Sequence, residues 1–289
     1  AGIPNEAIQL ILGDGKIGAR LTKHKDVAGV AFTGSTEVAK LIQKSLAEKS
    51  GPIVPLIAET GGQNAMIVDS SALPEQVIDD VVQSAFGSCG QRCSALRILY
   101  IQDDVADKTL EMLDGAMSEL IVGHPENLSA DIGPVIDKDA LNILQTHRKK
   151  LDGFGTKISE AKLDVTNTRD GHFFAPCAFE IMDANHLERE VFGPILHIIR
   201  YKAAEIDKVI DAINATGYGL TLGVHSRIEG FQKKIAERCN VGNAYVNRTT
   251  IGAVVGSQPF GGQGLSGTGP KAGGPNYLHA FATEKVISI

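Results

Sequence analysis

The residues best suited to covalent chemistry lie in one glycine-flanked segment, Phe86-Gly-Ser-Cys-Gly-Gln-Arg-Cys-Ser-Ala-Leu-Arg97. The helical apolar pattern before this segment stops at its glycines, so we expect a turn that presents Cys93. A cysteine thiolate is a strong nucleophile at neutral pH, and a glycine-flanked turn leaves room for a carbonyl substrate. A free cysteine is otherwise most often a small buried hydrophobic residue, and the residue type alone leaves both interpretations open.

A second candidate is Glu59, which ends the apolar run at 52–58 and is followed by Thr60 and two glycines. Burial at the end of a strand raises the pKa of a carboxyl group towards neutrality and makes it a candidate general base. The alternative is a solvated carboxylate at a strand end.

Two turns could bind a phosphate group. Gly13-Asp-Gly-Lys-Ile-Gly18 follows the apolar run at 7–12 and matches the G-x-G-x-x-G dinucleotide pattern. Thr33-Gly-Ser-Thr36 follows the run at 27–32 and opens a segment with helical apolar spacing, for which Ser35 is a suitable N-cap. Free N–H groups at such a helix start could face a pyrophosphate, although the same residues could simply cap a helix.

Composition excludes several classes of protein. The net charge of −6 and the absence of a long basic cluster argue against a nucleic-acid-binding surface. The four cysteines lack metal-ligand spacing, so we expect reduced thiols and no metal site. The start of the chain reads as neither a signal nor a transit peptide, and no apolar run approaches the roughly 20 residues that span a bilayer.

Apolar runs of strand length alternate with helical patterns along most of the chain, which predicts an α/β fold. Residues 121–187 are less regular, 252–275 form a glycine-rich loop, and 281–289 end in a strand-like Lys-Val-Ile-Ser-Ile. The expected strands are 27–32, 52–58, 65–68, 96–101, 195–201, 220–225 and 241–246, and the expected helices are 74–86, 105–120, 204–214 and 228–239.

Five motifs occur in the order and approximate spacing of the aldehyde dehydrogenase superfamily, which the whole chain resembles. They are Phe32-Thr-Gly-Ser-Thr-Glu37, Glu59-Thr-Gly-Gly62, Gly90-Gln-Arg-Cys93, Glu190-Val-Phe-Gly-Pro194 and Pro259-Phe-Gly-Gly262. Gly62-Gln-Asn64 and the segment 266–277 look most like the L-glutamate-γ-semialdehyde (1-pyrroline-5-carboxylate) dehydrogenase branch found in bifunctional bacterial proline-utilisation proteins. The resemblance implies a three-layer α/β/α fold with parallel sheets, the N-terminal part of which lies outside this chain.

The same resemblance implies a role for each matching residue. Cys93 is the nucleophile that forms a thiohemiacetal, and Glu59 is the base that activates the water for hydrolysis of the later thioester. The matching cofactor positions are Thr33, Gly34, Ser35, Gly61, Glu190 and Phe192, and the matching substrate positions are Ser94, Gly252, Ala253 and Phe260. The turn at 13–18 then lies near the adenine at most.

The resemblance also implies a domain division. Residues 1–61 would be the C-terminal part of the NAD-binding domain, 62–256 the catalytic domain, and 257–289 a substrate-anchor loop with a C-terminal tail strand. The superfamily's oxyanion-hole asparagine and adenine-ribose lysine have no counterpart here. Cys89 stands where the branch is expected to have alanine, and it reads either as a small buried side chain or as a thiol that pairs with Cys93 on oxidation.

The resemblance implies NAD-dependent oxidation of L-glutamate-γ-semialdehyde to L-glutamate in proline catabolism. The alternatives are another aldehyde, such as succinate semialdehyde or a betaine-type substrate, and an inactive fragment that serves folding or assembly. The expected partners are a second copy of the chain and an upstream proline dehydrogenase domain, which would bring FAD. The expected location is the cytoplasm, with the parent protein able to lie peripherally at the inner membrane.

Overall fold

Seven strands form the central sheet of this protein in the order β10-β9-β3-β4-β7-β6-β5. The structure is a computed structural model that describes residues 2–164, 166 and 168–289. Neighbouring strands run parallel except for β5, which is antiparallel to β6. The strands are β3 (Ala65–Val68), β4 (Ile98–Gln102), β5 (Thr156–Glu160), β6 (Cys177–Glu180), β7 (Ile195–Tyr201), β9 (Thr221–His225) and β10 (Asn243–Val246).

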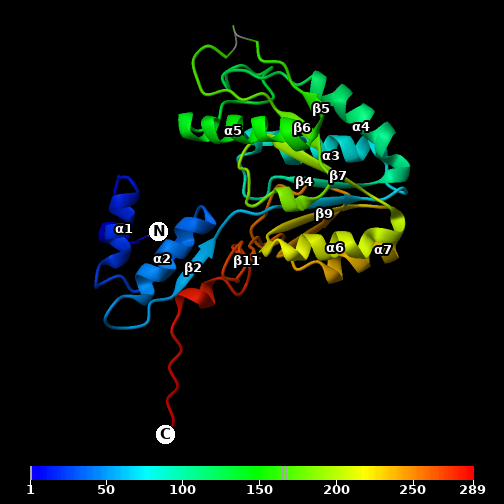
Figure 1. Cartoon of the computed structure of the whole chain (residues 1–289). Coiled ribbons are helices and arrows are strands. Elements are labelled where there is room, and N and C mark those ends of the chain that lie inside the picture. Colours follow the sequence, from blue (N-terminus) through cyan, green and yellow to red (C-terminus); the bar gives the residue numbers. More distant parts are fainter. Residues whose placement is uncertain (1, 165, 167) are drawn as a thin grey trace.

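Helices cover both faces of this sheet and give three layers (Figure 1). One face carries α3 (Pro74–Phe86), α4 (Asp103–Ser118) and α5 (Lys138–Phe154), and the other carries α6 (Ile206–Ala215) and α7 (Glu229–Arg238). The three-layer α/β/α expectation is therefore confirmed. Within the central sheet of the described residues, the expectation of parallel strands fails at the edge strand β5.

A smaller unit precedes the central sheet and lies at its side in Figure 1. Its strands β1 (Val30–Thr33) and β2 (Leu56–Glu59) pair in parallel, and its helices α1 (Gly15–Lys23) and α2 (Thr36–Ala47) contact each other. The short strands β8 (Tyr218–Gly219) and β11 (Gln263–Gly264) pair antiparallel and bring the late glycine-rich loop back to the site. Short 3₁₀ turns complete the assignment: η1 (Asn5–Ala7), η2 (Gly87–Gly90), η3 (Ala184–His186), η4 (Ala203–Glu205) and η5 (Leu278–Phe281).

The core surrounds β3 and β4, whose residues are all buried. A parallel strand covered by helices on both faces consists of consecutive apolar residues. Both strands were predicted from such apolar runs. The helix predicted at 105–120 is α4, and it buries Leu110, Leu113 and Met117.

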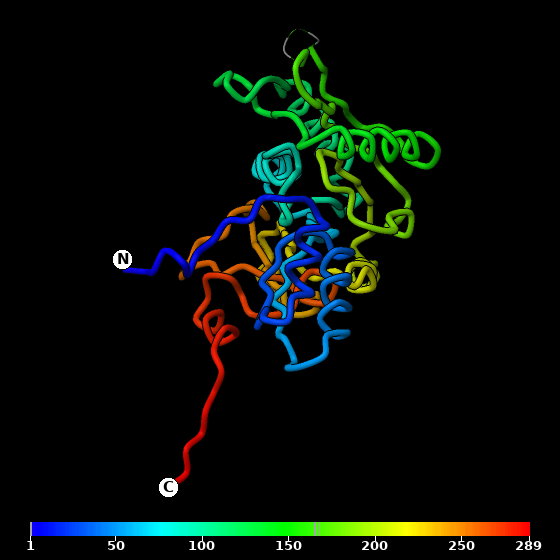
Figure 2. The backbone as a smooth tube through the Cα atoms, turned by 90° about the vertical axis from the view of Figure 1, so that its left-hand side faces the viewer, coloured from blue at the N-terminus to red at the C-terminus, as the bar shows by residue number. Residues whose placement is uncertain are grey.

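The apolar run at 7–12 and the strand-like C-terminal segment do not form strands. Residues 8–14 carry no regular structure and expose Leu10 and Leu12, and residues 282–289 extend away from the body with Val286 exposed (Figure 2). A strand needs a neighbouring strand for its backbone hydrogen bonds, and neither segment pairs with one among the described residues.

Conversely, α5, β5 and β6 were missed in the region 121–187, because α5 buries only Leu144 and Leu151 and therefore has a sparse apolar stripe.

None of the helices in the described part of the chain is long and apolar enough to cross a membrane.

The buried position of β4 predicts a large effect of a single truncation. Leu99→Ala should lower the free energy of unfolding by about 2–5 kcal/mol, because it removes packed methyl groups and leaves a cavity. Leu128→Ala is the matched control, since Leu128 is fully exposed and its loss should change stability by no more than about 0.5 kcal/mol. Urea unfolding of both variants measures the difference, and equal midpoints would contradict this description of the core.

Candidate active site

Cys93 is presented by an unusual turn after α3. Ser88, Cys89 and Gly90 have φ angles of 55°, 56° and 62°, so three successive residues adopt the left-handed conformation. A Cβ atom on Gly90 would lie 2.3 Å from the carbonyl oxygen of Gly193, which explains the glycine at this point. The predicted turn is therefore present, and it leaves Cys93 half-buried.

Hydrogen bonds from two distant segments fix the residues around Cys93. The Asn64 amide nitrogen donates to the carbonyl oxygens of Cys93 at 2.7 Å and Ala95 at 2.9 Å. The Thr250 hydroxyl donates to the carbonyl oxygen of Ser94 at 3.0 Å. The segment around Cys93 is thus tied to the start of β3 and to the loop after β10.

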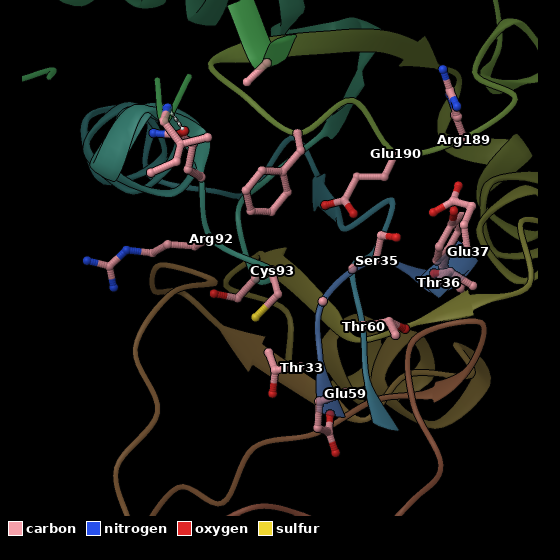
Figure 3. A pocket seen from close by; sticks show the side chains of 18 of the residues that line it. Thr33, Ser35, Thr36, Glu37, Glu59, Thr60, Arg92, Cys93, Arg189 and Glu190 are labelled. Carbon is pink, nitrogen blue, oxygen red and sulfur yellow. Dashed lines mark hydrogen bonds between the residues drawn. The ribbon is translucent and has the colours of Figure 1, made fainter. Parts of the chain in front are cut away.

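Glu59 is the last residue of β2, as its apolar run predicted. Its Oε2 accepts the backbone N–H of Gly262 at 3.2 Å, while its Oε1 is buried without a hydrogen-bond partner among the described residues. Burial raises the pKa of Glu59, and the Gly262 N–H and the charge of Lys271 oppose that shift. Figure 3 shows the carboxylate turned away from Cys93.

One cavity of about 800 Å³ is lined by Cys93, by Glu59 and by every residue that the motifs assigned to cofactor or substrate (Figure 3). The sequence separated these residues into distant motifs, and the fold brings them all to one place. The assigned residues on the wall are Thr33, Gly34, Ser35, Gly61, Glu190, Phe192, Ser94, Gly252, Ala253 and Phe260. Their individual roles stay proposals.

The same wall contains residues that no motif marked. Ile136, Ala140 and Ile143 come from α5 and the segment before it, where the sequence pattern is irregular. Arg189 and Tyr218 also line the cavity. Because α5 has few apolar residues, the sequence did not predict that its first turns line the cavity.

The N-terminus of α2 opens into this cavity through Thr33, Gly34 and Ser35. The Ser35 hydroxyl accepts the N–H of Val38 at 3.3 Å, so Ser35 is the predicted N-cap. A Cβ on Gly34 would lie 2.4 Å from the ring of Phe32, so this turn accepts only glycine without rearrangement. Free N–H groups at a helix start suit the pyrophosphate of a dinucleotide, and the continuous cavity from this turn to Cys93 gives room for the rest of it.

The other glycine-rich turn does not reach the cavity. In Gly13–Gly18 the side chain of Asp14 caps α1 by accepting the N–H groups of Lys16 and Ile17. None of these residues lines the cavity around Cys93, so the fingerprint match does not identify the phosphate-binding turn of this site.

Arg97 is a buried residue of the site that the sequence analysis did not assign. Its guanidinium lies 3.0 Å from the carboxylate of Glu190. Burial raises the pKa of Glu190, and the positive charge of Arg97 opposes that shift. The signal in the sequence was a charged residue directly before the apolar strand β4, since such a residue is buried only when it is paired.

The two cysteines of the turn have different surroundings. Burial and the carboxylate of Glu190 raise the pKa of the Cys93 thiol, while the N–H groups of Ser94 and Cys93 oppose the shift. Cys89 is almost completely buried, and desolvation raises its pKa to about 12. The structure therefore favours the small buried side chain for Cys89. Among the described residues, no group of three or more His, Cys, Asp or Glu is arranged to bind a metal.

Comparison with known proteins places this geometry in a family. The model of the aldehyde dehydrogenase family matches residues 1–287. The bifunctional protein PutA of Klebsiella aerogenes is 53% identical over 99% of this chain, but the chain spans only 22% of that relative. A crystal structure of a bifunctional proline utilization A protein superposes with a TM-score of 0.95 at 57% identity, over 98% of this chain and 29% of the other. A 1-pyrroline-5-carboxylate dehydrogenase from Thermus with bound NAD has a TM-score of 0.90 at 33% identity, over 97% of this chain and 54% of the other.

The environment of Cys93 predicts how its thiol reacts without ligands. Since its pKa is raised, the thiolate fraction is small at neutral pH and should keep growing above the ordinary thiol range of roughly 8 to 9. The rate of Cys93 alkylation by iodoacetamide, followed by peptide mass spectrometry, should therefore still increase at pH 9. Cys89 serves as the internal control and should stay unmodified in the folded protein. A rate for Cys93 that is already constant below pH 8 would contradict this assignment.

Proposed function

The chain belongs to the aldehyde dehydrogenase family, and from that premise we propose that it carries the catalytic residues for oxidation of L-glutamate-γ-semialdehyde to L-glutamate with NAD⁺. The observation that carries the proposal is the single cavity that joins Cys93, Glu59 and the N-terminus of α2. Support for the substrate comes from the names of similar proteins, which include PutA and 1-pyrroline-5-carboxylate dehydrogenase. The NAD-bound Thermus structure supports the cofactor.

Cys93 begins the reaction. Its sulfur bonds to the aldehyde carbon while the thiol proton passes to water and the π electron pair of the carbonyl moves onto its oxygen, which gives an anionic thiohemiacetal. The N–H groups of Cys93 and Ser94 lie beside the sulfur, where they stabilise negative charge on the reacting atoms. NAD⁺, held along Thr33, Gly34, Ser35 and Glu190, would supply the hydride acceptor for this carbon, and the substrate would then remain attached to Cys93 as a thioester.

Glu59 completes the reaction. Its unpartnered Oε1 takes a proton from water, the water oxygen bonds to the thioester carbon, and the carbon–sulfur bond breaks to release the carboxylate product and Cys93. The segment from Gly262 to Thr268 positions this residue, because Gly267 bridges to Glu59 and Thr268 donates its N–H to the Ala58 carbonyl at 2.9 Å. The late glycine-rich loop therefore supports the base rather than only closing the chain.

The α-carboxylate of the substrate would lie against Ser94 and the loop that contains Gly252 and Ala253, with Phe260 beside the aliphatic stem. Arg248 braces this loop by donating to the side-chain oxygen of Gln258 at 2.9 Å. A hydroxyl and backbone N–H groups are suitable donors for a carboxylate. This is the part of the proposal that separates the semialdehyde from betaine-type and other aldehydes.

We extend the proposal to the organisation of the protein. Residues 1–61 contribute to the NAD-binding domain, 62–256 to the catalytic domain, and 257–289 to the anchor loop and tail. A proline dehydrogenase domain with FAD in the same protein, a homo-oligomer and a cytoplasmic location, with peripheral contact at the inner membrane, follow from the resemblance of the motifs and belong to the same proposal.

The substrate proposal predicts a ranking of aldehydes. In the full-length protein, kcat/KM with NAD⁺ should be higher for L-glutamate-γ-semialdehyde than for succinate semialdehyde or betaine aldehyde. Cys93→Ser should lower turnover by on the order of 10³-fold or more while NAD⁺ still binds, because a hydroxyl is a far weaker nucleophile than a thiolate. A higher kcat/KM for another aldehyde would contradict L-glutamate-γ-semialdehyde as the substrate. Unchanged turnover of Cys93→Ser would refute the mechanism.

The role of Glu59 predicts a separate kinetic signature. Glu59→Gln should still form NADH in a rapid first turnover and then slow down, because the thioester accumulates when no base activates water. In the unaltered protein kcat should rise with pH through the raised pKa of Glu59, since only the deprotonated carboxylate accepts a proton, and this rise should be absent in Glu59→Gln. Rapid-mixing absorbance at several pH values measures both effects. The loss of the first turnover itself would show that Glu59 is not limited to hydrolysis.

A further inference from the structure

The guanidinium of Arg97 uses all of its hydrogen-bonding capacity. An arginine side chain has five N–H groups, and in Arg97 each of them has an acceptor. Nη1 donates to the carbonyl oxygens of Gly90 at 2.7 Å and Gly193 at 3.1 Å, Nη2 donates to Arg92 at 3.2 Å and to Glu190 at 3.0 Å, and Nε donates to Glu190 at 3.3 Å. Only 2% of the side chain is exposed, so these bonds form away from bulk water.

The acceptors come from two loops that meet at the cavity. Gly90 and Arg92 belong to the turn that presents Cys93, while Glu190 and Gly193 belong to the loop that also carries Phe192. The ring of Phe192 lies over the guanidinium at 5.1 Å from its centre. Arg97 therefore connects the proposed nucleophile with the proposed nicotinamide side of the site.

The turn before Cys93 needs such a connection. Ser88 and Cys89 are non-glycine residues with positive φ, a conformation that is unfavourable because it brings Cβ too close to the following carbonyl oxygen. The turn persists only if the surrounding structure holds it. Arg97 provides two of these contacts, at Gly90 and Arg92, on either side of Gln91.

Glu190 extends the connection to a third segment. The N–H of Gly62 donates to its carboxylate, and a Cβ on Gly61 would lie 1.7 Å from its Oε2. The carboxylate is therefore wedged between Arg97 and the loop that follows Glu59. A shift of this carboxylate would have to disturb both the Cys93 turn and the Glu59 loop.

The backbone of Arg97 is fixed as well. Its carbonyl oxygen accepts the backbone N–H of His197 at 3.0 Å and lies 2.9 Å from Nδ1 of the same ring. The Nε2 of His197 lies 2.9 Å from Nε2 of His147 on α5. If Nδ1 of His197 donates to Arg97, its Nε2 accepts the proton of His147, and both nitrogens of His197 then have a partner. The guanidinium thus projects from a backbone position that is anchored directly before β4.

We propose that Arg97 is a positioning residue for the oxidation step. It holds the Glu190 carboxylate and the Cys93 turn at a fixed separation, so that the carbon attached to Cys93 meets the nicotinamide in the orientation required for hydride transfer. This proposal rests on the proposed function, because it assigns Glu190 to the nicotinamide ribose. Arg97 itself touches neither substrate nor cofactor and acts through Glu190 and the turn.

The test measures the rate of NADH formation in the first turnover of the full-length enzyme. Arg97→Met should slow this rate by about 10²-fold, the size of effect expected from a displacement of about 1 Å between reacting groups. The amplitude of the first turnover, which counts active sites, should stay within twofold of the unaltered enzyme. A structural role alone would lower the amplitude and leave the rate of the surviving sites unchanged, and that outcome would overturn the proposal.

A double-variant comparison tests whether Arg97 acts through Glu190. The first-turnover rate of Arg97→Met/Glu190→Gln should lie no more than about threefold below the slower single variant, because both substitutions interrupt the same contact. If the fold-decrease in rate of the double variant equals the product of the fold-decreases of the two single variants, the proposal is overturned. Arg97→Lys retains the charge but cannot reach all five acceptors, so its rate should lie between those of the unaltered enzyme and Arg97→Met. If Arg97→Met does not fold, Arg97→Lys with Glu190→Gln provides the same comparison.

Arg200 offers a matched control on the neighbouring strand β7. It pairs with Glu180 at 3.0 Å and Asp107 at 2.6 Å, outside the cavity. Arg200→Met and Glu180→Gln remove an arginine–carboxylate pair in the same way, and their first-turnover rates should stay within twofold of the unaltered enzyme. If these variants slow the first turnover as much as Arg97→Met does, removal of any arginine–carboxylate pair has this effect, and the proposal is overturned.

Hydrogen exchange provides a readout that needs no substrate. In Arg97→Met or Arg97→Lys, the amides of 86–97 and 188–194 should exchange faster together, by about tenfold or more, while the Arg200→Met protein shows no change in either segment. Unchanged exchange in one of the two segments would overturn the coupling. If the unaltered enzyme forms no NADH from the semialdehyde, the proposed function fails, and the exchange experiment still decides whether Arg97 couples the two loops.

Discussion

The site of this protein depends on how one buried positive charge is satisfied. A guanidinium removed from water is stable only when its donors are paired, and Arg97 finds its acceptors in two loops and one carboxylate. Loss of any of these contacts would leave a buried polar group without a partner. The desolvation of a single residue therefore fixes where the Cys93 turn and Glu190 lie with respect to each other.

The cavity is lined by residues of the β1–β2 unit and by residues beside the central sheet. Glu59 and the N-terminus of α2 come from the carboxyl ends of β2 and β1, while Cys93 lies before the amino end of β4. The chain crosses between the sheets at Gly61 and Gly62. A Cβ on Gly61 would overlap a side-chain oxygen of Glu190, and a Cβ on Gly62 would overlap the side-chain oxygen of Asn64. Close approach of the backbone at this crossing lets Glu59, Cys93 and the N-terminus of α2 line one cavity.

The elements that the sequence analysis misjudged have a common physical cause. The apolar residues at 8–12 and 284–289 have the composition of strands, but extended backbone becomes a strand only beside another strand. The chain spans 22% of the length of the Klebsiella relative, and Leu10 and Val286 are exposed in this structure. The edge strand β5 runs antiparallel, and the residue types of a strand do not indicate its direction. Helix α5 packs on the sheet with few apolar residues, so its apolar spacing did not predict a helix.

The sequence by itself determined the local features of this protein. Continuous apolar runs specified β3, β4 and β7, Ser35 specified the start of α2, and the glycines around Cys93 specified a turn, because each depends on neighbours within a few residues. The order of the motifs also indicated the aldehyde dehydrogenase family, which the family match confirms. Only the tertiary structure decided that Arg97 connects the Cys93 turn with Glu190, that Glu59 has one oxygen without a partner, and that α5 walls the cavity. These features are contacts between segments far apart in the chain, so no local pattern of residue types could encode them.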